Sequence, residues 1–187
     1  HGKKIILYFG VVSPRKGQDI AIKAFEKAMI NLPDHVLVIT GKAPKDFKAY
    51  EEKIHQYVID RKIQDRIIFT GFLEDSEVET LFEMCESALY LYQPMSGSTY
   101  ALTFAIQYAK PVIVTELKIF HEILSDDCAL FVKVNDVEET AKGLVRISTD
   151  NVLRDKFSSR MKEISKKYTW SKAAMDHFTL YKELISK

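Results

Sequence analysis

The sequence predicts an α/β fold: a single Rossmann-like, doubly wound domain with a six-stranded parallel sheet and C-terminal helices. Short apolar runs alternate with segments of helical periodicity from residue 4 to residue 134. Strands that alternate with helices form βαβ units, whose right-handed crossovers make the sheet parallel and cover both of its faces. The remainder, residues 137–187, has helical patterns only, and we expect these last helices to pack beside the sheet.

Six segments have the pattern of buried strands. The first, KIILYFG, is apolar and ends at Gly10, and the second, HVLVITG, ends in the same way at Gly41. Short apolar runs bounded by turn residues are typical of strands that are buried on both faces. The predicted strands are 4–10, 35–41, 66–72, 87–93, 111–116 and 128–134.

Helical spacing of apolar residues predicts the helices between and after these strands. Ile20, Ala24 and Phe25 lie on one face of the first helix, which Pro33 brings to an end. Asp75 or Ser76 is expected to cap the third helix. The first helix is predicted over 17–31. The other predicted helices are 46–62, 98–109, 119–124, 137–148, 151–167 and 171–186, with Trp170 as an anchor between the last two.

Length and charge limit the class of protein. We expect one domain over residues 1–187, because the chain has no internal repeat and no linker. Lys and Arg outnumber Asp and Glu by 27 to 26, which argues against a nucleic-acid partner but leaves peripheral contact with a membrane open. No apolar run is long enough to span a bilayer. Cys85 and Cys128 lie in apolar contexts, so a cytoplasmic, reduced protein is expected.

The first strand is followed by two cations and then by a helix. Ligands of doubly wound folds bind at the carboxyl ends of strands, where the strand order reverses. Arg15 and Lys16 stand directly before the helix, and cations at a helix N-terminus favour phosphate. The segment is neither GxGxxG nor a Walker A motif. A solvated turn with two surface cations is the alternative interpretation.

The fourth strand is followed by a loop of small and hydroxyl residues, Ser96-Gly97-Ser98-Thr99, which opens into a helix. Free backbone N–H groups at a helix N-terminus bind anions, and Gly97 would let a ligand approach the backbone. The alternative is an ordinary helix cap at Ser96 or Ser98.

Glu116 and Glu122 follow the fifth strand, where a carboxylate can accept hydrogen bonds from sugar or ribose hydroxyls. Either could instead complement a helix dipole. His121 stands beside Glu122 near the expected cleft. The other histidines share no spacing typical of metal ligands, and no metal site is expected.

The order of these motifs resembles the C-terminal, nucleotide-sugar-binding half of GT-B glycosyltransferases, specifically the large retaining family 4. The resemblance runs from about residue 4 to the end. Its segments are ILYFG, SPRKGQDIAIKAF, VLVITGK, RIIFTGFLEDSEVETLF, the Ser-Gly loop, AKPVIVTE, a helix with Glu122, ALFVKVNDVEETAKGL and YTWSKAAMDHFTLYKELI.

The resemblance implies transfer of a hexosyl group from a UDP- or GDP-linked sugar donor to an acceptor hydroxyl, with no cofactor. It implies that an N-terminal acceptor domain completes the enzyme, so that this chain alone binds donor without turnover. The residues implied to hold the donor diphosphate are Arg15, Lys16, Ser96, Gly97, Ser98 and Thr99. Those implied to line the base and ribose are Gly41, Gly71, Phe72 and Leu73, with Glu116 and Glu122 near the sugar or ribose.

The chain departs from the family pattern at several positions. Val11 stands where the family has an arginine, and Arg15 could replace it. Alignment on the KPVI segment places Ser96 and Phe104 where the family has two glutamates. Lys118 and Ile119 replace paired glycines.

These departures keep two further hypotheses open. One is a non-catalytic pseudo-glycosyltransferase that binds a partner protein. The other is a flavodoxin-like or receiver-like module, although the acidic cluster of a receiver is missing after the first strand.

Overall fold

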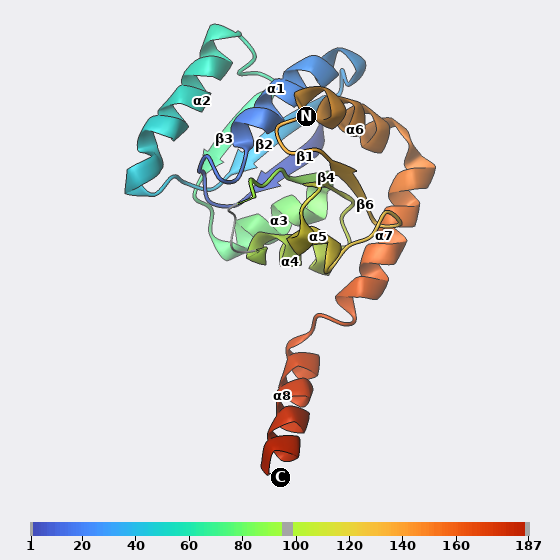
Figure 1. The fold of residues 1–187 in the computed structure, drawn as a ribbon. Helices are drawn as coiled ribbons and strands as arrows, with labels where there is room; N and C mark the ends of the chain where they lie inside the picture. Colours follow the sequence, from blue (N-terminus) through green and yellow to red (C-terminus); the bar gives the residue numbers. More distant parts are fainter. Residues whose placement is uncertain (1, 95–98, 186–187) are drawn as a thin grey trace.

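The computed structural model describes residues 2–94 and 99–185. Its sheet has six strands in the order β3-β2-β1-β4-β5-β6, and every strand pair in it is parallel (Figure 1). The predicted six-stranded parallel sheet is therefore confirmed. The strands are β1 (Lys4–Phe9), β2 (His35–Thr40), β3 (Ile67–Gly71), β4 (Cys85–Tyr90), β5 (Val112–Thr115) and β6 (Ala129–Val132).

The helices also follow the predicted order. They are α1 (Gln18–Ala28), α2 (Lys48–Asp60), α3 (Asp75–Met84), α4 (Tyr100–Gln107), α5 (Lys118–His121), α6 (Val137–Thr149), α7 (Asn151–Ser165) and α8 (Trp170–Ile185), with 3₁₀ turns at Met29–Asn31 and Lys45–Phe47. The predicted cap of α3 was wrong by one residue, because Glu74 is the N-cap. Its backbone N–H donates to the Glu77 carboxylate at 2.9 Å, which completes a capping box. The prediction missed Glu74 because it relied on the preference of N-cap positions for short side chains such as Asp and Ser.

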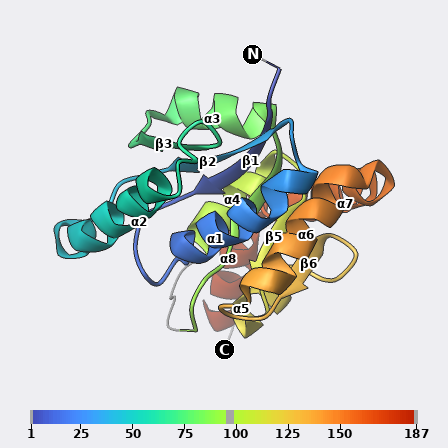
Figure 2. The ribbon, with the colours of Figure 1, turned by 90° about the horizontal axis from the view of Figure 1, so that it is seen from above.

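Helices cover both faces of the sheet (Figure 2). Buried side chains of α1, α2 and α6 pack on one face, and those of α3, α4 and α5 pack on the other. Helix α7 contributes to both clusters, since its Phe157 joins the first while Met161 and Ile164 join the second. This is the doubly wound arrangement that the alternation of strands and helices predicts.

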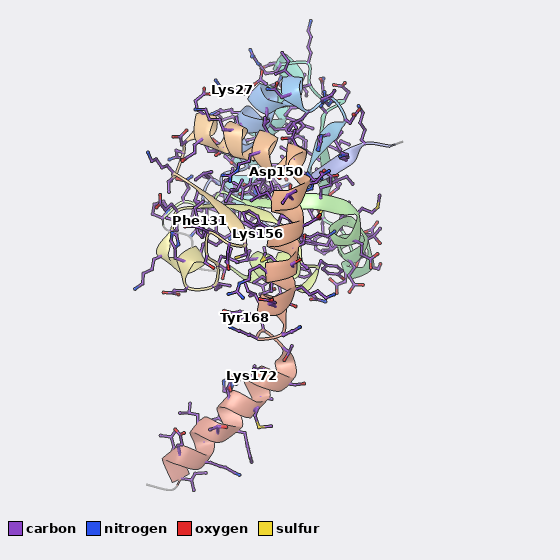
Figure 3. All side chains as sticks on the ribbon, turned by 90° about the vertical axis from the view of Figure 1, so that its right-hand side faces the viewer. Lys27, Phe131, Asp150, Lys156, Tyr168 and Lys172 are labelled. Carbon is purple, nitrogen blue, oxygen red and sulfur yellow. The ribbon has the colours of Figure 1, made fainter. Side chains whose placement is uncertain are left out.

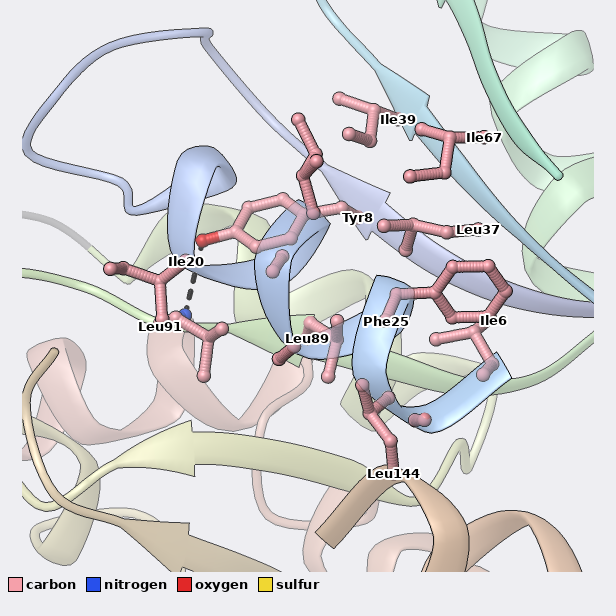
Figure 4. Close-up of a cluster of buried hydrophobic side chains, with 14 of the residues drawn as sticks. Ile6, Tyr8, Ile20, Phe25, Leu37, Ile39, Ile67, Leu89, Leu91 and Leu144 are labelled. Carbon is pink, nitrogen blue, oxygen red and sulfur yellow. Dashed lines mark hydrogen bonds between the residues drawn. The ribbon is translucent and has the colours of Figure 1, made fainter. Parts of the chain in front are cut away.

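Ile6, Leu37 and Phe25 are fully buried between the sheet and α1, as Figure 4 shows. Each such side chain contributes about 1.5–3 kcal/mol when it is removed from water. Cys85 and Cys128 are buried, as predicted, and burial raises the pKa of the Cys85 thiol to about 12. Both thiols therefore belong to the core rather than to a reactive site.

Helix α8 does not pack beside the sheet, and for this helix the prediction was wrong. The chain leaves the domain after Tyr168, and α8 extends away from it (Figures 1 and 3). Every side chain described from 171 to 185 is exposed. Helical periodicity shows that one face of a helix is apolar but not what covers that face. The side chain of Trp170, the expected anchor, lies outside the described part of the structure.

Among the described residues, no helix combines the length and apolar character needed to cross a membrane.

Candidate functional site

The strand order of the sheet reverses between β1 and β4, and the loops that follow these two strands are in direct contact. The backbone N–H of Gln93 donates to the Arg15 carbonyl at 2.9 Å. The first and fourth junctions therefore lie side by side at the reversal of strand order, the point where doubly wound folds bind their ligands.

Gly17 makes this contact close. Its φ is +77°, and a Cβ atom built there would lie 2.2 Å from the Leu91 carbonyl oxygen. Only glycine accommodates both the left-handed backbone conformation and the close approach of the Leu91 backbone. The part played by Gly17 emerges only from the structure.

Lys16 lies at this switch point with its side chain half-buried. Its ammonium nitrogen lies 3.6 Å from the centroid of the Tyr92 ring. Burial, and to a smaller extent the neighbouring Arg15 charge, together lower the pKa of Lys16 to about 8. An opposite charge, such as a phosphate, would restore the ordinary preference for the charged form.

A buried tyrosine of β1, Tyr8, holds the backbone of Lys16 in place. The Tyr8 hydroxyl donates to the Lys16 carbonyl, and the same hydroxyl accepts from the Leu91 N–H at 3.1 Å (Figure 4). Tyr8 is buried, and burial raises its pKa well above the ordinary value, so it remains a neutral donor. One side chain of β1 thus connects both junctions.

Arg15, the second predicted phosphate ligand, is exposed and turns toward a different part of the edge. Its guanidinium carbon lies 5.6 Å from the centroid of the Phe47 ring, in the segment after β2. The structure therefore brings the backbones of Arg15 and Lys16 to one place but directs the Arg15 side chain toward the β2–α2 connection.

Gln18 supports the first junction and was missed by sequence reasoning. Its side chain is fully buried, its Nε2 donates to the Val11 carbonyl at 2.9 Å, and its Oε1 accepts from the Ser13 N–H at 3.4 Å. A glutamine in the first turn of a helix is ordinarily solvated. No local pattern distinguishes this one, because its partners belong to the folded loop.

Three glycines stand in a row at the ends of β1, β2 and β3. Gly10 donates its N–H to the Thr40 carbonyl at 3.1 Å, and Gly41 donates to Gly71 at 2.8 Å. At Gly41, where φ is +124°, a Cβ atom would lie 2.0 Å from the Gly10 carbonyl oxygen. The predicted base-lining residues Gly41 and Gly71 thus form a shelf of backbone without side chains.

The side chains around this shelf differ in exposure. Phe72 is 71% exposed and Val11 is 50% exposed, so both present apolar surface at the carboxyl edge. Leu73 instead packs against the core cluster on the α3 face. Of the two predicted apolar residues that follow Gly71, only Phe72 therefore offers its side chain to a ligand.

Thr99 is the N-cap residue of α4 and the one member of the predicted Ser-Gly loop that the structure describes. Ser96, Gly97 and Ser98 lie outside the described residues. Within α4, Phe104 turns inward, with its ring centroid 4.9 Å from that of Phe9 and 5.6 Å from that of Phe82. Phe104 is partly buried and packs against the core cluster on the α3 face.

The fifth junction lies next to the fourth. The Thr115 hydroxyl donates to the Tyr92 carbonyl at 2.9 Å, so Glu116, the following residue, begins at this edge. Glu116 is exposed, and Glu122 is exposed at the C-terminal end of α5. The His121 ring is stacked on Phe131 at a centroid distance of 4.1 Å, which gives it a packing role.

Asn135, after β6, is a second residue that the sequence did not indicate. Its side-chain oxygen accepts from Nε2 of Gln93 at 2.8 Å, which ties the sixth junction to the fourth. Its φ is +61°, a conformation that asparagine tolerates better than most residues. Among the described residues, no group of three or more histidine, cysteine or acidic side chains could hold a metal ion.

A groove of about 390 Å³ lies away from this edge, between α1 and α2. Its polar groups are used to join the two helices, since the Tyr50 hydroxyl donates to Asp19 at 2.8 Å and the Tyr57 hydroxyl donates to Glu26 at 2.6 Å. The switch point, with its cation and exposed backbone, is the stronger candidate for the functional site.

Comparison with known proteins identifies the family. The family model of glycosyl transferases group 1 matches residues 1–167. The phosphatidyl-myo-inositol mannosyltransferase of Mycolicibacterium smegmatis is 22% identical over 183 residues, which are 96% of this chain and 45% of that protein.

Two solved structures share the fold. The chain superposes on Anabaena Alr3699/HepE in complex with UDP with a TM-score of 0.87 at 18% identity, covering 100% of this chain and 50% of that one. The C-terminal domain of a glycosyl transferase group 1 family protein, LpcC, from Francisella tularensis gives a TM-score of 0.81 at 22% identity, covering 89% of this chain and 86% of that one.

The chain spans about half the length of the curated relatives that it matches. The family model nevertheless covers the whole sheet and helices α1 to α7. The chain therefore belongs to the glycosyl transferases group 1 family.

Proposed function

We propose that this chain is the donor-binding half of a retaining glycosyltransferase, which transfers a hexosyl group from a UDP- or GDP-linked sugar to an acceptor hydroxyl. The observation that carries the proposal is the position of Lys16, a half-buried cation at the contact between the first and fourth junctions. Membership of the family and the fold shared with a UDP complex of HepE support it.

Separation of the sugar from the leaving diphosphate creates the charge that the site must stabilise. Lys16 would place a cation against that charge in a partly dehydrated position, where the interaction is stronger than in water. Arg15 and the loop of residues 96–99 would contribute a second cation and backbone N–H groups. A cation that is already in place when the bond breaks lowers the barrier, because no reorganisation is needed at that moment.

The neighbouring surfaces would hold the rest of the donor. The backbone shelf at Gly41 and Gly71 lets a base and ribose approach closely, with Phe72 as an apolar border. Glu116 and Glu122, exposed after β5, would accept hydrogen bonds from ribose or sugar hydroxyls.

The acceptor and part of the catalytic machinery would come from an N-terminal domain. The relatives are about twice as long as this chain, which supports such a second half. Helix α8 would contribute to the contact between the halves, because Phe178, Tyr181 and Leu184 are each more than half exposed on it. The chain alone would therefore bind donor without turning it over.

Calorimetric titration with UDP and with GDP tests the proposal. We expect one of the two to bind, and Lys16→Ala to weaken its affinity by roughly 1–3 kcal/mol, the cost of a lost charge-assisted hydrogen bond. Lys156→Ala, which removes an exposed cation on α7, is the matched control and should leave the affinity unchanged. Absence of binding by both nucleotides would refute the donor-binding function.

A non-catalytic, partner-binding domain is the second candidate. It is favoured by Phe104, which occupies a glutamate position of the family and packs between Phe9 and Phe82, where it offers no hydrogen-bond acceptor. If this second function is correct, neither UDP nor GDP will raise the melting temperature of the chain. If the chain instead binds the donor, a nucleotide concentration of 100 times the dissociation constant should stabilise it by about 2.7 kcal/mol.

A further inference from the structure

Tyr92, the second residue after β4, lies directly beneath the Lys16 ammonium group. Its side chain is 1% exposed, and one face of its ring lies 3.6 Å from the Lys16 nitrogen. On other sides it contacts Phe120 and Tyr90, with ring centroids 5.2 and 6.0 Å away. The ring is thus held by the core on one side and contacts the cation on the other.

The hydroxyl of Tyr92 does not explain why a tyrosine stands here. It is buried and has no hydrogen-bond partner among the described residues, whereas the Tyr90 hydroxyl donates to the Ala101 carbonyl at 2.8 Å. A buried hydroxyl without a partner costs stability. The favourable contribution of this side chain must therefore come from its aromatic ring.

An aromatic face attracts an ammonium group through the negative potential above the ring. The attraction is larger when the cation has lost part of its water, as Lys16 has. The ring thereby opposes the two influences that disfavour the charged lysine, which are burial and the neighbouring Arg15. It also limits the positions that the flexible lysine side chain adopts.

We propose that Tyr92 is a positioning residue, whose ring face holds the Lys16 ammonium group at the switch point where the diphosphate of the donor binds. This inference rests on the proposed function, because the role of the held ammonium is to meet a phosphate. Tyr92 itself need not touch the donor.

Two substitutions separate the ring from the hydroxyl. Tyr92→Phe keeps the aromatic face, and Tyr92→Leu keeps an apolar contact without it. Phe120→Leu is the matched control, because it removes an aromatic neighbour of Tyr92 and leaves the Tyr92 ring itself in place. Tyr92→Met, with its adaptable side chain, replaces Tyr92→Leu if the latter does not fold.

Two measurements are made on each variant of the 187-residue chain. The pKa of Lys16 is followed by NMR of its side-chain amine, which requires no nucleotide. The affinity for UDP and GDP is measured by calorimetry between pH 6.5 and 9. We expect Tyr92→Leu to lower the pKa of Lys16 further and to weaken nucleotide binding about tenfold, increasingly as the pH rises. Tyr92→Phe and Phe120→Leu should behave as the unmodified chain does.

A double-mutant cycle with Lys16→Ala distinguishes positioning from a general structural effect. If Tyr92 acts through Lys16, Tyr92→Leu has no further effect on nucleotide affinity once Lys16 is alanine. An equal loss in both backgrounds, or an unchanged pKa of Lys16 in Tyr92→Leu, would overturn the inference. Failure of the unmodified chain to bind either nucleotide would instead refute the proposed function, while the pKa measurement would still decide whether Tyr92 holds Lys16.

Discussion

Replacement of Gly17 by alanine tests the contact between the two junctions most directly. The new Cβ atom would lie 2.2 Å from the Leu91 carbonyl oxygen and 3.2 Å from its carbonyl carbon. Real Cβ contacts stop near 3.0 Å, so the Leu91 backbone must retreat by at least about 0.8 Å. That movement would separate Lys16 from Tyr92 and strain the hydrogen bond from Gln93 to Arg15.

The cost has two parts. A residue other than glycine in the left-handed region, here at φ +77°, costs about 1–2 kcal/mol. The overlap with a backbone atom adds about 1–3 kcal/mol, the range found when closely packed sites are overfilled. Denaturant unfolding should therefore show Gly17→Ala to be less stable by roughly 2–5 kcal/mol.

Gly71→Ala is the matched control. Gly71 has nearly the same backbone conformation, with φ +71°, but a Cβ atom there would have no neighbour within 4 Å. It should carry only the conformational part of the cost, about 1–2 kcal/mol. If Gly17→Ala is no less stable than Gly71→Ala, the close approach of the first and fourth junctions, and the site built on it, is refuted.

Three other predictions concern protons and the chain end. At pH 8 about half of the Lys16 side chains are neutral before UDP binds, so UDP binding should be accompanied by proton uptake. Calorimetry in buffers of different ionisation enthalpy measures this uptake. An uptake that persists in Lys16→Ala would contradict its assignment to Lys16. Burial lowers the pKa of His35 in the folded chain from 6.5. As the pH falls, His35 is therefore protonated more readily in the unfolded chain than in the folded one, and the free energy of unfolding should decrease below about pH 6.5. Acid titration of unfolding checks this, because His35→Gln should reduce the loss, and an identical pH dependence would count against it. Removal of residues 170–187 should leave the melting temperature unchanged, since the side chains described from 171 to 185 are exposed; a clear decrease would show that α8 packs on the domain.

The local pattern of the sequence determined the secondary structure and the parallel direction of the strands, but not their order in the sheet. Apolar runs bounded by glycine and helices with one apolar face are properties of a few neighbouring residues, so each strand and helix could be recognised separately. Their alternation then implied parallel strands, because the handedness of βαβ crossovers leaves few other arrangements. The family resemblance, rather than this alternation, implied that the cations before α1 and the loop after β4 hold one diphosphate.

Only the tertiary structure decided how that edge is built. The contact of Lys16 with Tyr92, the buried amide of Gln18 and the bond between Gln93 and Asn135 depend on residues from separate strands and loops. No spacing along the chain encodes such contacts, since they arise from strand register and from the space that core packing leaves. Helix α8 shows the same limit: periodicity revealed that one of its faces is apolar, but only the tertiary structure shows that this face is not packed on the sheet.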